Sequence, residues 1–320
     1  MRIVKACVAM LTSVTIISQL GELHFIVDNL SNFRVHCAVA FLICAAVLLV
    51  AGNIRWLVLS GIGLAVNLVP VVPWYFPESG LSDNGATQTV KILVSNVYRR
   101  NTDYGKLTRL LEEEKPEVVA LVEVNSGWLA NVPALRAEYA FRFEAPHDQY
   151  IGLALYSKLP LSDSRIVHFG ESAPPAIVSL LHTPEGVVEF ILAHPVPPMN
   201  AALTERRNTQ LRNMAHYVRT KATPVLLAGD LNVTMWNPNY RLFAEHSGLH
   251  NARAGYGTGP TWPAVLALGI PIDHILATTP SRLTNFRVHQ SIGSDHLPIS
   301  AELSLTGRSN ARESTDLAQR

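Results

Sequence analysis

The pattern of hydrophobic positions divides the chain into a front part with few charges and a longer part in which short apolar runs alternate with polar stretches. Three long apolar segments cover residues 3–20, 35–52 and 54–76. Each is long enough for a helix that crosses a bilayer, which takes about 20 residues. A helix without a polar face has no side to turn toward water. We therefore predict three transmembrane helices in residues 1–76.

Basic residues near the ends of these segments predict the orientation. The charged residues of the front part are Arg2, Lys5, Glu22, Asp28, Arg34 and Arg55. Arg2, Lys5 and Arg55 fall on one side of the predicted membrane and Arg34 on the other, so the positive-inside rule assigns the first side to the cytoplasm. Three crossings then carry the rest of the chain outside the cytoplasm. The first segment begins like a signal peptide, but no small-residue cleavage pattern follows it, which favours an uncleaved anchor.

The part after residue 76 predicts a linker, a folded domain and a tail. Residues 77–89 are polar and rich in turn formers, and residues 306–320 lack an apolar period, so we predict a linker and a disordered tail. Runs of β character lie between them, at 90–97, 118–124, 152–156, 176–181, 187–193, 225–231, 272–277 and 299–303. Helical periods occur at Leu107, Leu110 and Leu111, and at Leu203, Leu211, Met214 and Val218. Strands with few helices between them predict stacked sheets with helices outside.

Composition narrows the class of domain. All three cysteines, Cys7, Cys37 and Cys44, lie in the apolar segments, so the domain at residues 90–305 needs no disulfide and tolerates an oxidising compartment. The 26 Lys and Arg residues nearly balance the 25 Asp and Glu residues, and the balance also holds after residue 76. A near-neutral domain has no obvious excess of basic residues that would bind a nucleic-acid backbone.

Acidic, amide and histidine side chains stand where the predicted strands begin or end. They are Asn96, Glu123, His194, Asp230, Asn232, Asp273, His274, Asp295 and His296. Each has a structural explanation by itself, since Asp and Asn form turns and a single histidine often serves only the fold. Together they provide oxygen ligands for a divalent cation, a carboxylate to orient water, and histidines to handle protons. Carboxylates and amides favour Mg²⁺ over Zn²⁺, so the pattern predicts metal-assisted phosphoester hydrolysis.

The same residues lie in motifs that resemble the endonuclease/exonuclease/phosphatase superfamily. The motifs run in order through residues 90–305 as VSNV, LVEVN, GLALYSK, AHPVPP, AGDLNVT, PTWP, PIDHILAT and GSDHLPI. GDLN and SDHLP are specific as a spaced pair. The resemblance implies an α/β fold, a four-layer sandwich of two stacked mixed sheets flanked by helices. The apolar front part is similar to a bacterial membrane-anchored branch, which implies a multi-pass protein of the inner (plasma) membrane with a periplasmic or extracellular catalytic domain.

The resemblance also implies a metal site and the residues around the attacking water. Glu123 would be the principal ligand of Mg²⁺, with Mn²⁺ as the alternative ion, and Asn96 and Asp295 would lie close to the metal. Asp230 would orient or deprotonate the attacking water. Asn232 would hold the phosphate.

Two histidines complete the implied site. His296, paired with Asp273, would contact the scissile phosphate or take a proton, because a carboxylate partner raises the basicity of a histidine. His194 would be a second proton donor or phosphate contact. His274 points away from Asp273 if this segment is a strand, and we predict that it is structural.

Two further interpretations concern residues beside the site. We predict that Trp262 fills the core rather than lining the pocket. We interpret Arg206, Arg207 and Gln210, at the start of a helix, as a solvated face.

The function predicted is that of a membrane-anchored, Mg²⁺-dependent hydrolase of phosphodiesters or phosphomonoesters. The substrate stays open between a phospholipid headgroup, a nucleic acid and a small phosphate ester, and the only other partner inferred is the lipid bilayer. A neutral domain held beside a bilayer fits a lipid somewhat better than a polyanion. The alternatives are a nuclease acting on DNA or RNA and a catalytically inactive phosphate-binding module.

Overall fold

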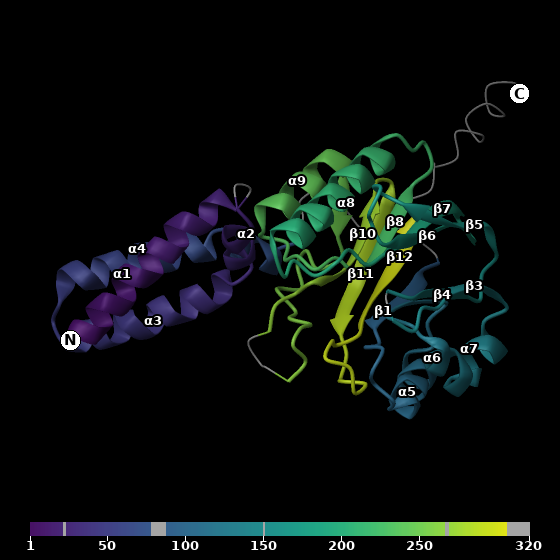
Figure 1. Cartoon of the computed structure of the whole chain (residues 1–320), viewed down its shortest axis with the longest axis horizontal. Coiled ribbons are helices and arrows are strands. Elements are labelled where there is room, and N and C mark those ends of the chain that lie inside the picture. The colour runs from purple at the N-terminus through teal and green to yellow at the C-terminus, as the bar shows by residue number, and fades with distance from the viewer. Residues whose placement is uncertain (22–23, 78–87, 150, 266–268, 306–320) are drawn as a thin grey trace, which may run out of the picture.

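The computed structural model describes residues 1–21, 24–77, 88–149, 151–265 and 269–305. The predicted tail at residues 306–320, and residues 78–87 of the predicted linker, lie outside the described residues. Within the described part, a bundle of N-terminal helices projects from a body that contains the strands (Figure 1).

The projecting bundle consists of helices α1 (Arg2–Ile17), α3 (Arg34–Val50) and α4 (Ile54–Leu68). Short helices lie at its base: η1 (Ser18–Leu20), α2 (Phe25–Ser31) and η2 (Val72–Tyr75). The ring of Phe41 packs directly on Gly63, where an added Cβ would lie 2.3 Å from the ring. The missing side chain at residue 63 therefore allows α3 and α4 to pack closely.

The prediction of three transmembrane helices at 3–20, 35–52 and 54–76 is not supported in that form. Helices α1, α3 and α4 have 16, 17 and 15 residues, and no single described helix is both long and apolar enough to cross a membrane. Helices α2 and α3, bent by 66° at their break, meet the length and composition criteria together. Helix α4 ends before Pro70, because proline disfavours a helical conformation in the residue before it.

The body contains two mixed six-stranded sheets. The first has the order β11 (Ser281–Val288), β12 (Ile299–Leu305), β1 (Val90–Asn96), β2 (Val118–Val122), β4 (Leu153–Ser157) and β3 (Phe141–Ala145). The second has the order β5 (Leu161–His168), β6 (Pro175–Thr183), β7 (Gly186–Ala193), β8 (Val225–Asp230), β10 (Asp273–Thr278) and β9 (Leu249–Asn251). Each sheet has one parallel pair at its centre, β1 with β2 and β7 with β8, while the other pairs are antiparallel.

The sheets pack face to face, and helices cover their outer faces. The core between the sheets includes Ile92, Val94, Phe190, Leu226 and Ile275. Helices α5 (Tyr104–Glu114), α6 (Ser126–Asn131) and α7 (Pro133–Glu138) pack on the first sheet, and α8 (Ala201–Arg219) and α9 (Pro238–Ser247) pack on the second. The predicted arrangement of stacked sheets with helices outside is confirmed.

The element predictions are confirmed in part. Every predicted strand is present, with ends shifted by up to two residues, and α5 and α8 lie where the helical periods placed them. Strands β3, β5, β9 and β11 and helices α6, α7 and α9 are additional elements that the hydrophobic pattern did not predict.

Candidate functional site

Six of the predicted site residues meet at one end of the two sheets. Asn96 ends β1, and Glu123 follows β2; in the other sheet, His194 follows β7 and Asp230 ends β8. Each parallel pair of strands thus places two of these side chains at its carboxyl end. Asp273 opens β10 and is paired in register with Asp230. His296 precedes β12, the antiparallel neighbour of β1, and so joins the same end.

Glycine at position 229 allows the two central strands of the second sheet to come together here. Gly229 has a φ of 137°, and an added Cβ would lie 2.0 Å from the carbonyl oxygen of Ala193. The close approach places His194 Nδ1 3.1 Å from the carbonyl oxygen of Asp230 and 3.6 Å from its Oδ2. In the GDLN motif, Gly229 is therefore required for close packing of the strands, and Asp230 supplies a carboxylate to the site.

Two site residues have left-handed backbone conformations, which is uncommon outside glycine. Glu123 has a φ of 62° and Asn232 a φ of 52°. Both follow directly or closely on a buried strand, and both line the same pocket. Backbone strain of this kind concentrates at functional sites.

Glu123 is an ionised and partly accessible carboxylate at the junction of the two sheets. Its Oε1 accepts a hydrogen bond from Asn96 Nδ2 at 3.1 Å and lies 3.5 Å from His194 Nε2, and 23% of the side chain is exposed. Burial opposes ionisation, but the hydrogen bonds and charge of His194 and the amide of Asn96 outweigh it and lower the pKa of Glu123 to about 2. A permanently ionised carboxylate facing a pocket suits a cation ligand.

Asn96 connects the carboxylates of the two sheets. Its Nδ2 donates to Glu123 Oε1 and to Asp230 Oδ2, each at 3.1 Å, and its Oδ1 accepts from the backbone N–H of Tyr98 at 3.0 Å. The structure thus places Asn96 beside Glu123, the residue predicted as the principal metal ligand. In this arrangement its amide nitrogen, rather than its oxygen, faces the carboxylates.

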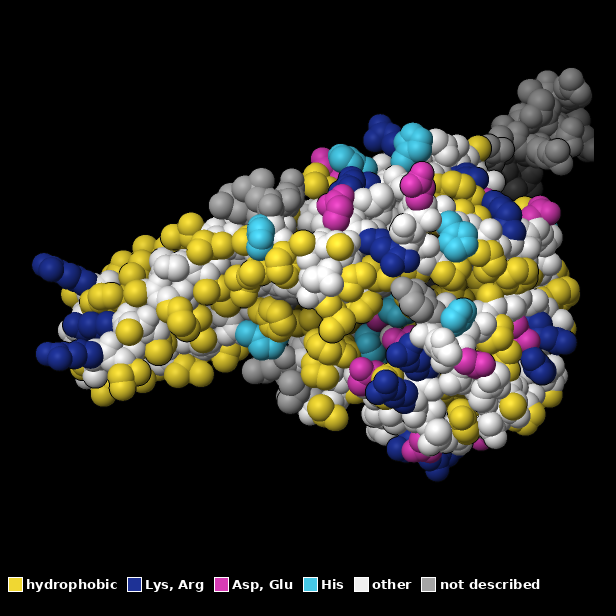
Figure 2. All heavy atoms as spheres, in the orientation of Figure 1, with side chains coloured by type: hydrophobic (Ala, Val, Ile, Leu, Met, Phe, Trp, Pro, Cys, Tyr) yellow, Lys and Arg dark blue, Asp and Glu magenta, His cyan; other side chains and the backbone are white. Residues whose placement is uncertain are grey.

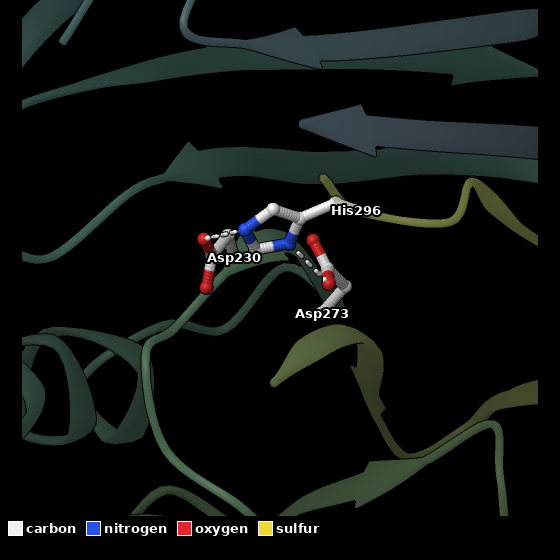
Figure 3. A group of neighbouring side chains, drawn as sticks. All are labelled: Asp230, Asp273 and His296. Carbon is white, nitrogen blue, oxygen red and sulfur yellow. Dashed lines mark hydrogen bonds and ion pairs between the residues drawn. The ribbon is translucent and has the colours of Figure 1, made fainter. Parts of the chain in front are cut away.

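His296 lies between two aspartates (Figure 3). Its Nδ1 is 2.9 Å from Asp273 Oδ2, and its Nε2 is 3.6 Å from Asp230 Oδ2. Burial disfavours the imidazolium, but the charges of Asp273 and Asp230 outweigh burial and raise the pKa of His296 to about 10. The predicted pairing of His296 with Asp273 is confirmed as a contact.

Asp230 and His194 are both fully enclosed, and their pKa values are displaced. Burial and the negative charge of Asp273 raise the pKa of Asp230, against the opposing effect of His296. Burial works against the protonated form of His194, but Asp230 and Glu123 together raise its pKa. The pocket therefore holds a carboxylate that accepts a proton more readily than usual, beside two histidines that release theirs less readily than usual.

Asn232 and Asp295 stand at the edges of the site. Asn232 donates from its side chain to the carbonyl of Pro195 at 2.9 Å, and its backbone N–H donates to Asp230 Oδ1 at 2.9 Å. Asp295 is exposed, and its Oδ2 accepts from Trp262 Nε1 at 3.3 Å. Among the hydrogen bonds of the described residues, none joins Asp295 to Asn96 or Glu123, so its predicted position beside the metal has no contact in support.

Two interpretations of neighbouring residues are wrong, and one is confirmed. Trp262 is only half-buried and lines the pocket, because its indole faces Asp295 instead of the core. Arg207 and Gln210 are fully buried rather than solvated. His274 is buried and bonded to Asn251 and the carbonyl of Val233, on the opposite side from Asp273, so its structural role is confirmed.

Arg207 is buried because the front part of the chain supplies its partner. Its guanidinium forms a short ion pair with Asp28 of α2 and donates from Nη1 to the carbonyl of Asn232 at 2.8 Å. The sequence reasoning missed this link. The available signal was Asp28 itself, because an acidic residue between long apolar segments generally has a partner or a function.

The site opens into a pocket of about 510 Å³ that the front part of the chain helps to build. Its polar lining includes Glu123, His194, Asp230, Asn232, Asp295 and His296, and residues Asn29, Asn32 and Phe33 approach from α2 and the turn after it. A second hollow of about 500 Å³ shares Glu123, His194 and Pro197 with the first and is lined also by Arg99 and Arg100.

The donor set fits a divalent cation with oxygen ligands. Glu123 offers an ionised carboxylate to the pocket. Asp230, Asp273 and His296 offer three ligand atoms that lie within 4.8 Å of one another. Asp273 Oδ1 is buried without a hydrogen-bond partner among the described residues, which leaves one carboxylate oxygen available.

Comparison with known proteins identifies similar sequences and folds. The Endonuclease/Exonuclease/phosphatase family model matches residues 93–296. A search of curated proteins found no match. Among solved structures, an endonuclease/exonuclease/phosphatase from Beutenbergia cavernae has a TM-score of 0.55 at 18% identity, covering 68% of this chain and 72% of that one.

Two further solved structures are of proteins whose names state a ligand or an activity. D. rerio TDP2, complexed with a single-strand DNA product, has a TM-score of 0.57 at 17% identity over 68% of this chain and 99% of that one. A mannosyl-6-phosphatase from Bacteroides thetaiotaomicron has a TM-score of 0.54 at 15% identity over 68% of this chain and 100% of that one. Likeness at these identities establishes the fold alone.

Proposed function

Because the chain belongs to the endonuclease/exonuclease/phosphatase family, we propose that it is a membrane-anchored, Mg²⁺-dependent phosphoesterase. One observation carries the catalytic part of this proposal. Asn96, Glu123 and His296 at the first sheet meet His194, Asp230 and Asp273 at the second, beside a single pocket. Carboxylates and imidazoles in this arrangement provide cation binding and proton transfer at one point, as phosphoester hydrolysis requires.

Glu123 would hold the metal ion, with Asn96 beside it. Carboxylate oxygens such as those of Glu123 suit Mg²⁺, and Mn²⁺ shares this preference. The bound ion would neutralise charge on the phosphate oxygens and lower the pKa of water.

The remaining residues would transfer protons during hydrolysis or hold the phosphate. Asp230 accepts the proton of the attacking water, because its raised pKa makes it a better base than an exposed aspartate. The water oxygen forms a bond to phosphorus as the bond from phosphorus to the leaving oxygen breaks. His296, protonated and oriented by Asp273, donates to the phosphate or to the leaving oxygen. His194 and Asn232 hold the phosphate from the opposite side.

The distribution of polar and apolar residues in the bundle supports the membrane anchor. Most of the exposed large hydrophobic side chains in the described residues belong to residues 1–76, and Figure 2 shows them covering the visible face of the bundle. Inside the bundle, the apolar packing of Val8, Phe41 and Leu48 is accompanied by polar bonds: Asn67 Nδ2 donates to Thr15 Oγ1 at 2.9 Å, and Ser60 Oγ donates to the carbonyl of Phe41 at 2.8 Å. Helices that present apolar side chains outward and bond through small polar groups inward are typical of a lipid environment.

The lengths and charges of the helices are compatible with this anchor. Helices of 15 to 17 residues span about 22 to 26 Å at 1.5 Å per residue. This is shorter than an average hydrocarbon core of about 30 Å, and local thinning of the bilayer compensates for such a mismatch at modest cost. Lys and Arg side chains gather at the free end of the bundle (Figure 2), where Lys5 lies 6.0 Å from the Trp56 ring.

The orientation that we propose follows from this charge. The basic end lies in the cytoplasm of a bacterial cell, and the body lies on the other side of the inner membrane, in the periplasm or outside the cell. The substrate classes retained are phosphate esters of lipids, of nucleic acids and of small molecules. A catalytically inactive binding module is less consistent with the chain, because every predicted catalytic side chain is present.

Removal of the metal or its ligand tests the catalytic proposal. Purified full-length protein should hydrolyse bis(p-nitrophenyl) phosphate or p-nitrophenyl phosphate with Mg²⁺ and lose this activity in excess EDTA. Glu123→Gln removes the charge that binds the ion, so kcat/KM should fall by at least a hundredfold with unchanged thermal stability. Glu245→Gln, an exposed change on α9, is the matched control and should retain full activity. Full activity in EDTA contradicts the metal requirement.

A further inference from the structure

The lining of the pocket has a polar part and an apolar part. The polar part carries the catalytic residues, and the apolar part, the apolar wall, includes Phe33, Pro198, Met199, Trp262, Ile270 and Ile272. Phe33 is 39% exposed and Met199 is 78% exposed. An apolar surface directly beside a phosphoester site indicates that the substrate has a hydrophobic part.

The apolar wall is continuous with the bundle. Phe33 stands at the 66° break between α2 and α3, immediately before the first residue of α3. Asn29 Nδ2 donates to the carbonyl of Pro198 at 2.7 Å, which ties α2 to the segment that carries Met199. Figure 2 shows hydrophobic atoms bordering the hollow on the side of the N-terminal helices. A molecule that occupies the pocket can therefore keep contact with the bilayer that surrounds the bundle.

The second hollow lies on the other side of the shared residues Glu123 and His194 and has a different character. Arg99 and Arg100 line it together with Tyr98 and Gln149. None of the described residues that line the first pocket is Lys or Arg. A phosphorus atom at the boundary between the two hollows would have an apolar surface on one side and two guanidinium groups on the other.

We propose that the substrate is a phospholipid phosphodiester taken from the bilayer in which the bundle stands. This inference rests on the proposed function. The hydrocarbon-bearing group of this lipid substrate lies along Phe33 and Met199, and its anionic headgroup lies toward Arg99 and Arg100. Hydrolysis joins the water oxygen to phosphorus, breaks one ester bond, and leaves a proton on the released alcohol. A nucleic acid carries a charge at every nucleotide and would meet no Lys or Arg among the described residues that line the first pocket.

Full-length protein in vesicles of dioleoylphosphatidylcholine with dioleoylphosphatidylglycerol tests the proposal. The water-soluble comparison substrates are glycerophosphoglycerol, which has the same headgroup without the chains, and bis(p-nitrophenyl) phosphate. We expect phosphatidylglycerol to be hydrolysed at least tenfold faster than its deacylated counterpart. Phe33→Asp and Met199→Asp should each lower the ratio of lipid to small-diester kcat/KM at least tenfold.

A matched control and three other outcomes complete the test. Phe141, exposed by 36% on β3 and outside both hollows, provides the control variant Phe141→Asp, which should leave the ratio within twofold. Met199→Asp changes an exposed loop residue and serves as the readout if Phe33→Asp does not fold. Equal rates for lipid and deacylated diester, or preferential cleavage of a single-stranded oligonucleotide, overturn the lipid inference but leave the hydrolase intact. Failure to hydrolyse any of these esters overturns the proposed function and this inference together.

Discussion

At the scale of single residues, the site depends on environments that only the folded chain supplies. Glu123 and Asp230 are both carboxylates at strand ends, yet the pKa of Glu123 is lowered and that of Asp230 is raised. The difference arises because Glu123 accepts hydrogen bonds at the pocket surface, whereas Asp230 is enclosed beside Asp273. Motif spacing identified both residues but could not assign these opposite states, since burial and neighbouring charges belong to the tertiary structure.

His274, the structural histidine next to the site, predicts how stability depends on pH. Burial lowers its pKa to about 3, against about 6.5 in an unfolded chain. The folded protein then binds fewer protons than the unfolded chain between these values, so stability is complete above about pH 6.5 and falls as the pH falls. The expected loss is up to about 1.4 kcal/mol per pH unit.

Thermal unfolding of the wild type and of His274→Gln between pH 7.5 and pH 4 measures this effect. Glutamine has a donor and an acceptor for Val233 and Asn251 but does not titrate. The melting temperature of the wild type should therefore fall more steeply than that of the variant as the pH decreases. Parallel curves would assign the acid sensitivity to other groups.

At the scale of elements, the sequence predicted strands that are apolar on both faces and missed those that are not. Strands β2 and β8 are fully buried and stand out as continuous hydrophobic runs. Strand β5 is an edge strand in which no side chain is fully buried, and β11 alternates buried positions with more exposed ones that carry mainly polar residues. An edge strand forms because it pairs with a neighbouring strand, and it does not need a strongly hydrophobic sequence. The local hydrophobic pattern therefore gives little indication that the strand exists.

The same limit explains the error at α8. Arg206, Arg207 and Gln210 have the composition of a solvated face, but Arg207 is buried against Asp28 of α2 and Gln210 is buried where it donates to the carbonyl of Pro174. Asn237 donates to the carbonyl and carboxylate of Asp28, so the ion pair with Arg207 belongs to a larger buried network. Contacts between segments about 180 residues apart leave no periodic trace in the sequence.

Removal of one partner of this ion pair should destabilise the junction of α2 with α8. Arg207→Met leaves Asp28 as an unpaired buried charge, which costs about 3–5 kcal/mol. The double change with Asp28→Asn should recover most of the loss. Arg212→Met breaks the exposed pair with Glu205 and serves as the control, with an expected cost below about 1 kcal/mol. Stability is measured by thermal unfolding in detergent. If the stability losses of the two single variants add in the double variant, Arg207 and Asp28 are not directly coupled.

At the scale of the whole molecule, the orientation of the bundle relative to the body decides where the site operates. The N-terminus and the turn between α3 and α4 lie at the free end of the bundle, and the body is attached at the other end (Figure 1). If the bundle crosses the membrane, these two ends face different compartments. The pocket then opens beside the membrane surface on the side of the body.

Reporter fusions test this topology. Alkaline phosphatase fused after Arg320 should be active in a bacterial host, because this enzyme folds only in an oxidising compartment. Green fluorescent protein fused at the same residue should remain dark after export through the general secretion route. The opposite pair of results would place the body in the cytoplasm and reverse the assignment based on Arg2, Lys5 and Arg55.

The wall that α2 contributes to the pocket has a consequence for modularity. Asn32 accepts hydrogen bonds from Thr234 and, through its carbonyl, from the indole N–H of Trp236, so separation of the two parts exposes groups that are now satisfied. A catalytic body produced without the N-terminal helices would retain every catalytic side chain. It would, however, lack one side of its pocket, and the guanidinium of Arg207 would lose its ion-pair partner. The helices and the hydrolase are therefore expected to be inherited, exchanged and engineered as one unit.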